Sequence, residues 1–178
     1  MENILVDNIQ VPHRIIKMKG DGNCLFRAFS YILFENEEFA QVVRRKVVDY
    51  VVDNWSRYEY FATNSNGEPF RNGVDYSSEM LRSNSYGTSC EITAAAFLYH
   101  WHIVVYRNGM ELMEFGETPA FSVRLRFTGN LNGGHFDVLE GDSTTGESQI
   151  CPSFTMADFL IPQQSNKRKK QQKKSKSK

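Results

Sequence analysis

One cysteine lies where a short loop meets a predicted helix, in the stretch GDGNCLFRAFSYILF that runs from Gly20 to Phe34. The spacing of the apolar residues that follow Cys24 predicts a helix over 24–33. A cysteine on the first turn of a helix lies beside outward-pointing backbone N–H groups, which together with the helix dipole favour its thiolate. Free cysteines are more often small buried hydrophobic residues, so Cys24 is either a packing residue or a nucleophile.

A nucleophilic thiol needs a base, and the base needs a group that orients it. Of the four histidines, His135 has an acid in the right place, because His135 and Asp137 point to the same face of the predicted strand HFDVL. Phe136 and Val138 then point into the core. This is the arrangement of a cysteine hydrolase, but a His-x-Asp pair on a strand is more often a surface pair, and spacing alone leaves both interpretations open.

The loop before the cysteine suits a supporting role. Gly22 can adopt a positive φ without steric cost. The segment Asp21-Gly22-Asn23 would then present backbone N–H groups near Cys24, as an oxyanion hole requires. The same residues are also common in turns and at helix caps, which is the purely structural interpretation of this segment.

The other cysteines and histidines are weaker candidates. Cys90 also lies on the first turn of a predicted helix, but no glycine-rich loop precedes it, and the Ala-rich sequence after it predicts a packed helix. Cys151, beside Pro152, predicts irregular structure. There is no CxxC pair, and His100 and His102 have the wrong spacing for one helix face, so we expect neither a metal site nor a cofactor.

Length and charge predict one folded domain with a tail. The chain has 178 residues, of which 40% are hydrophobic and 13% aromatic, enough for a buried core. Residues 167–178 hold eight of the 21 basic residues and none of the 21 acids, so the first 166 residues carry a net charge of −8. We expect a catalytic domain over 1–162 and a basic, disordered tail over 163–178 that contacts nucleic acid, directs nuclear import or only solubilises the chain.

The sequence also bears on the compartment. Residues 1–10 lack the apolar segment of a secretory signal, and no apolar run is long enough to span a membrane. Three cysteines are too few for a disulfide framework. We therefore expect an intracellular monomer without a membrane partner, cytoplasmic or, through its basic tail, nuclear.

The elements that must position these residues are helices first and strands afterwards. Helices are predicted over about 38–54, over 77–82 after a loop at 64–73, from the capping box Thr88-x-x-Glu91 to about His100, and in FTMADFLI from Phe154. Strands are predicted in RIIKM, HIVVY, ELMEF, SVRLRF and HFDVL, with a hairpin at Asn108-Gly109 and a polar loop over 128–134. This order predicts an α+β fold, a small, mostly antiparallel sheet packed between helices.

Three segments resemble the motifs of the ovarian tumour (OTU) cysteine proteases. GDGNCLFRAFSYILF is similar to the nucleophile motif, GGHFDVL to the histidine motif, and YGTSCEITAAAFLYHWHIVVY to the helix and strand between them. The resemblance covers about 15–140 and implies an OTU-like, papain-type fold. The sequence departs from the family pattern at Tyr86–Ser89, where many relatives have Trp-Gly-Gly.

The resemblance also implies roles and a reaction. By matching position, Cys24 is the nucleophile, His135 the general base and Asp137 the group that orients the histidine, and Asp21 supports the oxyanion loop. The implied reaction is hydrolysis of the isopeptide bond after the C-terminal glycine of ubiquitin, or of a ubiquitin-like modifier, with ubiquitin or polyubiquitin chains as partners. The net negative charge of the first 166 residues would attract the basic C-terminal tail of ubiquitin.

Two alternatives to this function stay open. One is a catalytically silent module that binds ubiquitin. The other is a protease that processes a viral or transposon polyprotein, because GDGNCLFRAFSY also resembles the OTU modules of such polyproteins.

Overall fold

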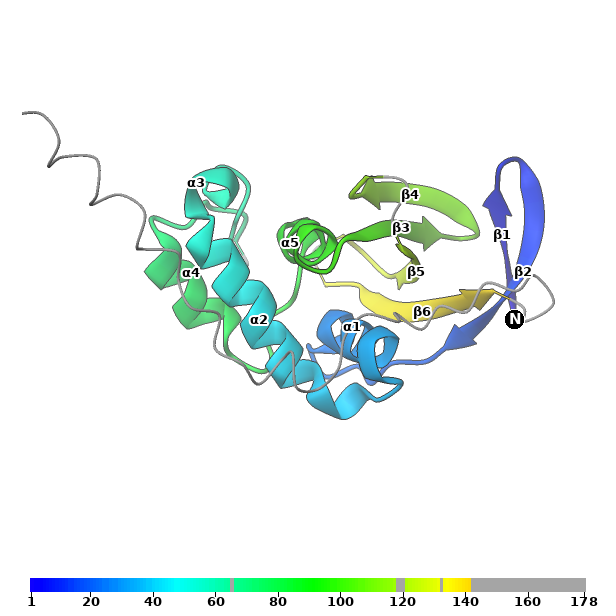
Figure 1. Ribbon diagram of the computed structural model, residues 1–178, viewed down its shortest axis with the longest axis horizontal. Helices are drawn as coiled ribbons and strands as arrows, with labels where there is room; N and C mark the ends of the chain where they lie inside the picture. Colours follow the sequence, from blue (N-terminus) through cyan, green and yellow to red (C-terminus); the bar gives the residue numbers. More distant parts are fainter. Residues whose placement is uncertain (65, 118–120, 132, 142–178) are drawn as a thin grey trace, which may run out of the picture.

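The computed structural model describes residues 1–64, 66–117, 121–131 and 133–141, which form an α+β fold (Figure 1). The elements in chain order are β1 (Glu2–Val6), β2 (Ile9–Ile16), α1 (Cys24–Phe34), the 3-10 helix η1 (Glu37–Phe39), α2 (Ala40–Asp53), α3 (Trp55–Tyr58), α4 (Gly73–Met80), α5 (Ser89–Tyr99), β3 (Trp101–Arg107), β4 (Met110–Phe115), β5 (Phe121–Thr128) and β6 (His135–Gly141). The predicted helix from Phe154, the domain boundary near Gln163 and Cys151 lie outside the described residues.

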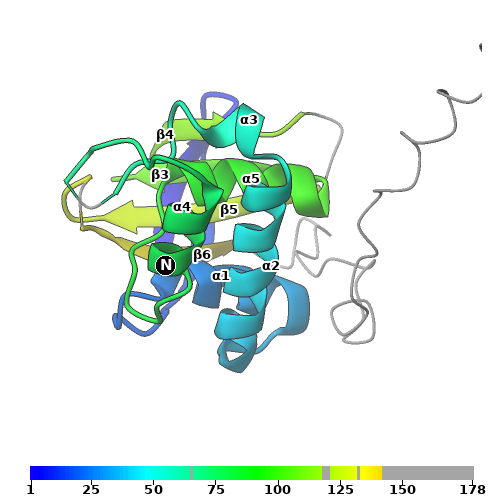
Figure 2. The same cartoon turned by 90° about the vertical axis from the view of Figure 1, so that its left-hand side faces the viewer.

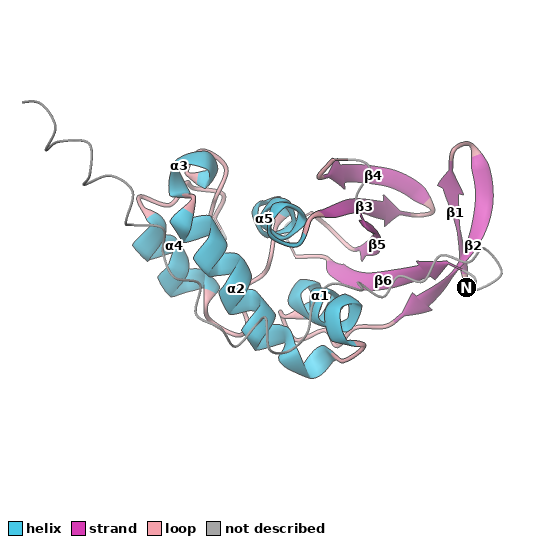
Figure 3. Ribbon diagram, in the orientation of Figure 1, coloured by secondary structure: helices cyan, strands magenta, loops and turns pink. Residues whose placement is uncertain are grey.

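One six-stranded sheet has the strand order β1-β2-β6-β5-β3-β4 (Figure 3). Its neighbours pair antiparallel except β3 and β5, which pair in parallel from Trp101↔Phe121 onward. The predicted α+β class with a mostly antiparallel sheet is therefore confirmed. The sheet curls until β1 meets the turn between β3 and β4, where the Leu5 amide donates to the Gly109 carbonyl at 2.8 Å.

The two faces of the sheet are buried in different ways. One face packs against the helices, which lie on the same side of the sheet (Figures 1 and 2). Alternate residues of β3 point to opposite faces, so Ile103 and Val105 join the main core while Val104 and Tyr106 join a small second cluster with Ile4. The curl of the sheet closes that second cluster.

Helices α1, α2 and α5 connect the loop before Cys24 and the helical part of the core to the sheet. Helix α1 packs against both α2 and β6, and α5 packs against α2 and β3. The helix predicted from Cys24 is confirmed and ends at Phe34, followed by the C-cap residue Glu35, whose φ of 53° is left-handed. The capping box that starts α5 is also confirmed, with Thr88 and Glu91 bonded reciprocally. No helix within the described ranges is both long and apolar enough to cross a membrane.

Two local predictions were wrong. Helix α4 begins at Gly73 rather than at residue 77, because the Asn72 side chain accepts hydrogen bonds from the amides of Val74 and Asp75 and caps it. The N-terminus is a hairpin of two strands rather than one short strand. Its turn residues Asp7 and Asn8 have φ values of 48° and 65°, the left-handed conformation that such a two-residue turn requires.

Candidate active site

Cys24 is the first residue of α1 and is only 3% exposed. Burial raises the pKa of its thiol, and the negative charge of nearby Asp137 raises it further. The backbone amides of Phe136, Leu25 and Cys24 itself offset part of this effect by hydrogen bonding to the sulfur. The thiol therefore lies against β6 in a pocket of backbone donors, and it needs a nearby cation to ionise at neutral pH.

His135 begins β6 and is held by Asp137 two residues later. Its Nε2 lies 3.0 Å from the Asp137 Oδ1 atom, the same-face geometry that strand periodicity predicts. Phe136 and Val138 point into the main core, as expected. The Nδ1 edge of the ring faces the loop that leads to Cys24, because a side chain at Gly20 would lie 3.8 Å from Nδ1 and from Cε1.

Asp137 is fully buried and accepts several hydrogen bonds. Besides His135, the Met18 amide donates to Oδ1 at 3.1 Å, and Lys17 and Arg126 approach Oδ2 at 3.1 and 3.3 Å. Burial alone would raise the pKa of Asp137, but the Met18 amide and the Lys17 ammonium outweigh it, so the pKa is lowered. The carboxylate is thus ionised and fixed in place. Nothing in the sequence pattern pointed to Lys17 or Arg126 as its partners.

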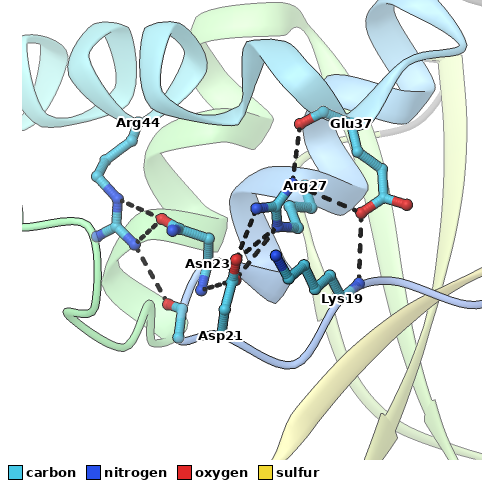
Figure 4. A network of polar contacts seen from close by, with 7 residues as sticks. Lys19, Asp21, Asn23, Arg27, Glu37 and Arg44 are labelled. Atoms are coloured by element: carbon cyan, nitrogen blue, oxygen red, sulfur yellow. Dashed lines mark hydrogen bonds and ion pairs between the residues drawn. The ribbon is translucent and has the colours of Figure 1, made fainter.

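The loop of Asp21, Gly22 and Asn23 is fixed from several sides (Figure 4). Asp21 accepts from Arg27 on α1, with a shortest contact of 2.6 Å, and this hydrogen bond lowers the pKa of Asp21. Asp21 also accepts from the Asn23 amide at 3.1 Å, which occupies one of the N–H groups predicted to face the substrate. Gly22 has a φ of 82°, and a Cβ there would lie 2.7 Å from the Asn84 carbonyl oxygen.

Arg44 on α2 also supports this loop, and it was not predicted from the sequence. Its guanidinium donates to the Asn23 side chain and to the Gly22 carbonyl. A signal was present, because Arg44 lies one helical turn before Val47 and Val48, on the buried face of an amphipathic helix. A charged residue on such a face needs polar partners, and the glycine-rich loop provides them.

Cys90 occupies a different environment from Cys24. It is 1% exposed, and burial raises the pKa of its thiol strongly, with the nearby Glu91 carboxylate adding to the effect. The Tyr76 hydroxyl donates to Glu91 at 2.8 Å, so the acid beside this cysteine is part of a buried hydrogen-bonded pair. The second first-turn cysteine therefore lies beside this buried acid rather than beside the His135–Asp137 pair.

The remaining histidines lie elsewhere in the fold. His100 ends α5 with a φ of 54°, and His102 on β3 pairs with Glu114 on β4. His13 is buried on β2, with its Nδ1 3.1 Å from the Val11 carbonyl oxygen. Within the part of the chain that the structure describes, no three His, Cys, Asp or Glu side chains are grouped to hold a metal ion.

A second aromatic segment borders the site. Tyr86 stacks on Phe136 with ring centroids 6.1 Å apart, and burial together with the nearby Cys24 raises its pKa. A Cβ at Gly87 would lie 2.6 Å from the Leu25 side chain, so this segment packs closely against the residue that follows the cysteine. Beside it opens a pocket of about 430 Å³, whose lining includes Asn84, Tyr86, Thr88 and Leu131. The pocket thus adjoins both the Gly22 loop and the segment before His135.

Together, these groups suit acyl transfer to a thiol. A buried thiol, an imidazole fixed by a carboxylate, and amides at a helix N-terminus are the nucleophile, base and oxyanion donors that such chemistry requires. The structure places the Cys24 thiol beside the Phe136 amide and near Asp137, which holds His135, and it places Asp21 against Arg27 rather than against the histidine.

Comparison with known proteins agrees with this geometry. The OTU-like cysteine protease family matches residues 19–128, a match that includes the nucleophile loop and ends before His135. OTU domain-containing protein 5 of Xenopus tropicalis is 31% identical over 146 residues, which are 79% of this chain and 26% of that protein. Ovarian tumor domain-containing deubiquitinating enzyme 7 of Arabidopsis thaliana is 26% identical over 168 residues, 93% of this chain and 43% of that protein.

The fold is shared as well. A solved ovarian tumor (OTU) domain in complex with ubiquitin has a TM-score of 0.57 and 21% identity, and the similarity covers 78% of this chain and 79% of that domain. The chain spans less than half the length of the two curated relatives. Motifs, fold and family match agree, and the chain belongs to the OTU-like cysteine protease family.

Proposed function

We propose that this chain is a deubiquitinase, which hydrolyses the isopeptide bond after the C-terminal glycine of ubiquitin through Cys24, His135 and Asp137. The observation that carries the proposal is the His135 ring, which hydrogen bonds to Asp137 at Nε2 and turns its Nδ1 edge toward the loop before Cys24. Two comparisons support the choice of substrate: a relative is named a deubiquitinating enzyme, and a structural neighbour contains bound ubiquitin.

In the first half of the reaction, His135 takes the thiol proton, and the imidazolium is stabilised by the Asp137 carboxylate. The Cys24 sulfur attacks the carbonyl carbon of the terminal glycine, forming a C–S bond and moving the carbonyl electron pair onto oxygen. In this proposal, amides at the start of α1 bind the oxyanion. The intermediate then collapses, the C–N bond breaks, and His135 gives its proton to the departing lysine amine.

In the second half, water replaces the amine beside His135. The neutral imidazole removes a proton from the water, and the resulting hydroxide attacks the thioester carbon. Collapse of the second intermediate breaks the C–S bond, releases the glycine carboxylate and returns Cys24 to its thiol form. Throughout, Asp137 holds one ring tautomer and orientation, and its ionisation is favoured by Met18 and Lys17.

The proposal is tested with a ubiquitin whose C-terminus carries a thiol-reactive electrophile, beside hydrolysis of a ubiquitin with a fluorogenic leaving group. The wild-type chain should be labelled at Cys24 and should turn the substrate over. Cys24→Ala should lose both activities and still bind ubiquitin, whereas the control Cys90→Ser should keep both. A wild-type chain that binds ubiquitin without labelling or turnover would be a silent binding module, and the proposal would be wrong.

The linkage preference is a separate measurement. A panel of linkage-defined di-ubiquitins, with a ubiquitin-like modifier joined to the same leaving group, distinguishes the possible substrates. We expect cleavage of at least one ubiquitin linkage. Cleavage of the modifier substrate alone would move the proposal from ubiquitin to that modifier.

A further inference from the structure

One arginine of the nucleophile helix binds both ends of the loop before the thiol. Arg27 follows Cys24 by three residues in α1, and its side chain turns back to Asp21 (Figure 4). There its Nε lies 3.2 Å from both carboxylate oxygens, and its Nη2 donates to Oδ2 at 2.6 Å. The Arg27 backbone amide donates to the Asn23 carbonyl at 2.8 Å. Arg27 therefore holds one end of the loop through its side chain and the other through its main chain.

These bonds fix the two peptide groups that precede the thiol. The peptide group between Gly22 and Asn23 is held by Asp21, whose Oδ1 accepts from the Asn23 amide at 3.1 Å. The next peptide group joins Asn23 to Cys24, and its carbonyl accepts from the Arg27 amide. An oxyanion site needs amides that keep one orientation, so the loop depends on a carboxylate that is itself held in place.

The ion pair that holds this carboxylate is partly exposed. The Arg27 and Asp21 side chains are 19% and 28% exposed, whereas Arg44, which binds the same loop, is fully buried. The hydrogen bond from Arg27 lowers the pKa of Asp21, so the carboxylate is ionised at neutral pH. Partly exposed ion pairs usually contribute little to folding stability, so we expect the loss of this pair to affect the loop more than the fold.

We propose that Arg27 is a positioning residue for the reaction, which holds the Asp21 carboxylate and through it fixes the loop that places Cys24. This inference rests on the proposed function. Without the Arg27 side chain, the carboxylate is free to rotate away from the Asn23 amide, and the loop loses its fixed turn. The consequence is specific, because an effect that passes through Asp21 must vanish when that carboxylate is absent.

The test is a double-mutant cycle on Arg27 and Asp21. Arg27→Gln removes the charge and the guanidinium fork. We expect it to lower kcat on the fluorogenic ubiquitin substrate at least about fivefold, with KM within about twofold, because a misplacement of about 1 Å at a reacting centre can cost about 10²-fold. Asp21→Ala should lower kcat at least as much. The double variant should have a kcat within about twofold of that of Asp21→Ala, since the two residues act as one unit.

Two control variants isolate this ion pair. Glu37→Gln neutralises the second acid near Arg27, whose Oε2 lies 3.8 Å from Nη1. Arg14→Gln breaks the ion pair with Glu140, which lies outside the loop. Both controls should keep the wild-type kcat. All kcat values are expressed per active site, titrated with the ubiquitin electrophile, so that unfolded chains are not counted.

An arginine that only stabilised the fold would leave kcat per active site unchanged in Arg27→Gln. An arginine that acted through other partners would make the losses of the two single variants multiply in the double variant. Either result overturns the inference. If Arg27→Gln does not fold, Arg27→Lys replaces it in the same cycle, because it keeps the charge and loses the fork.

The cycle is repeated with p-nitrophenyl acetate, which acylates Cys24 without ubiquitin, and a Cys24→Ala chain gives the background rate. Acylation that shows the coupling, in a chain that does not cleave ubiquitin, would refute the proposed function and support the role of Arg27. Absence of the coupling with both substrates would refute that role alone. A wild-type chain that reacts with neither substrate would refute both proposals.

Discussion

The glycine at the centre of the nucleophile loop allows a sharp test of how closely loop geometry and catalysis are connected. Gly22 has a φ of 82°, and Gly67, in another loop that lines the pocket beside Tyr86, has a nearly equal φ of 81°. A Cβ at Gly67 would meet nothing within 4 Å, whereas a Cβ at Gly22 would lie 2.7 Å from the Asn84 carbonyl oxygen. The substitutions Gly22→Ala and Gly67→Ala therefore share backbone strain and differ in steric overlap.

The size of the effect follows from these contacts. A left-handed backbone costs a non-glycine residue about 1–2 kcal/mol, and this cost applies to both variants. Relief of the overlap in Gly22→Ala also requires a displacement of about 0.7 Å, the difference between 2.7 Å and an ordinary contact of 3.4 Å. Because a misplacement of about 1 Å at a reacting centre can cost about 10²-fold, we expect kcat to fall by about 10- to 100-fold.

The assay measures kcat on a fluorogenic ubiquitin substrate together with the free energy of unfolding by urea. Gly67→Ala should lose stability and keep its kcat. Gly22→Ala should lose at least as much stability and most of its kcat. Equal kcat values for the two variants would show that the contact with Asn84 does not fix the catalytic loop, and would refute this prediction.

Three further predictions follow from the site. Asp137→Asn should lower kcat by roughly 10²- to 10⁴-fold, because an amide cannot stabilise an imidazolium. Asp21→Asn should lower kcat less. If parallel kinetics show a larger loss for Asp21→Asn, the wrong acid is assigned to His135. The lowered pKa of Asp137 means that its ionised form stabilises the fold above about pH 4 and that this contribution is lost as the pH falls through the lowered value. Unfolding by urea at pH 7 and pH 3 should therefore show a smaller acid loss for Asp137→Asn than for wild type, and equal losses would contradict the pKa assignment. Truncation after Pro162 should leave turnover of the fluorogenic substrate within about twofold, or about 0.4 kcal/mol, and a tenfold loss in a folded chain would show that the tail contributes to the site.

Local sequence rules were sufficient to predict the structural features that depend on residues close together in the chain. The helix from Cys24, the capping box of α5 and the turn at Asn108-Gly109 all depend on residues within one or two turns of each other. The His135–Asp137 pair is also a local feature, because strand alternation alone places both side chains on one face. The class of fold and the histidine geometry could therefore be expected from the sequence.

Contacts between distant segments could not be read from the sequence in the same way. Arg44 reaches Asn23 across 21 residues, and Lys17 reaches Asp137 across 120. Such pairs depend on how helices and strands pack, and a single sequence gives no measure of that. The first hairpin was missed for a different reason: its Asp7-Asn8 turn lacks the glycine of the strongest hairpin signals, although both residue types tolerate a positive φ.

The bonds of Asp137 bear on how this chain could lose its activity in evolution. The same carboxylate that holds His135 also joins the segment after β2, through Lys17 and Met18, to Arg126 on β5. Its loss would leave the buried Met18 amide without its acceptor and would remove one of the partners of Arg126, whereas Cys24 could become a similar small residue with little change in packing. A duplicated copy that became a binding protein would therefore be expected to lose the cysteine first and to keep the aspartate. A missing aspartate would indicate a change in the sheet as well as in the chemistry.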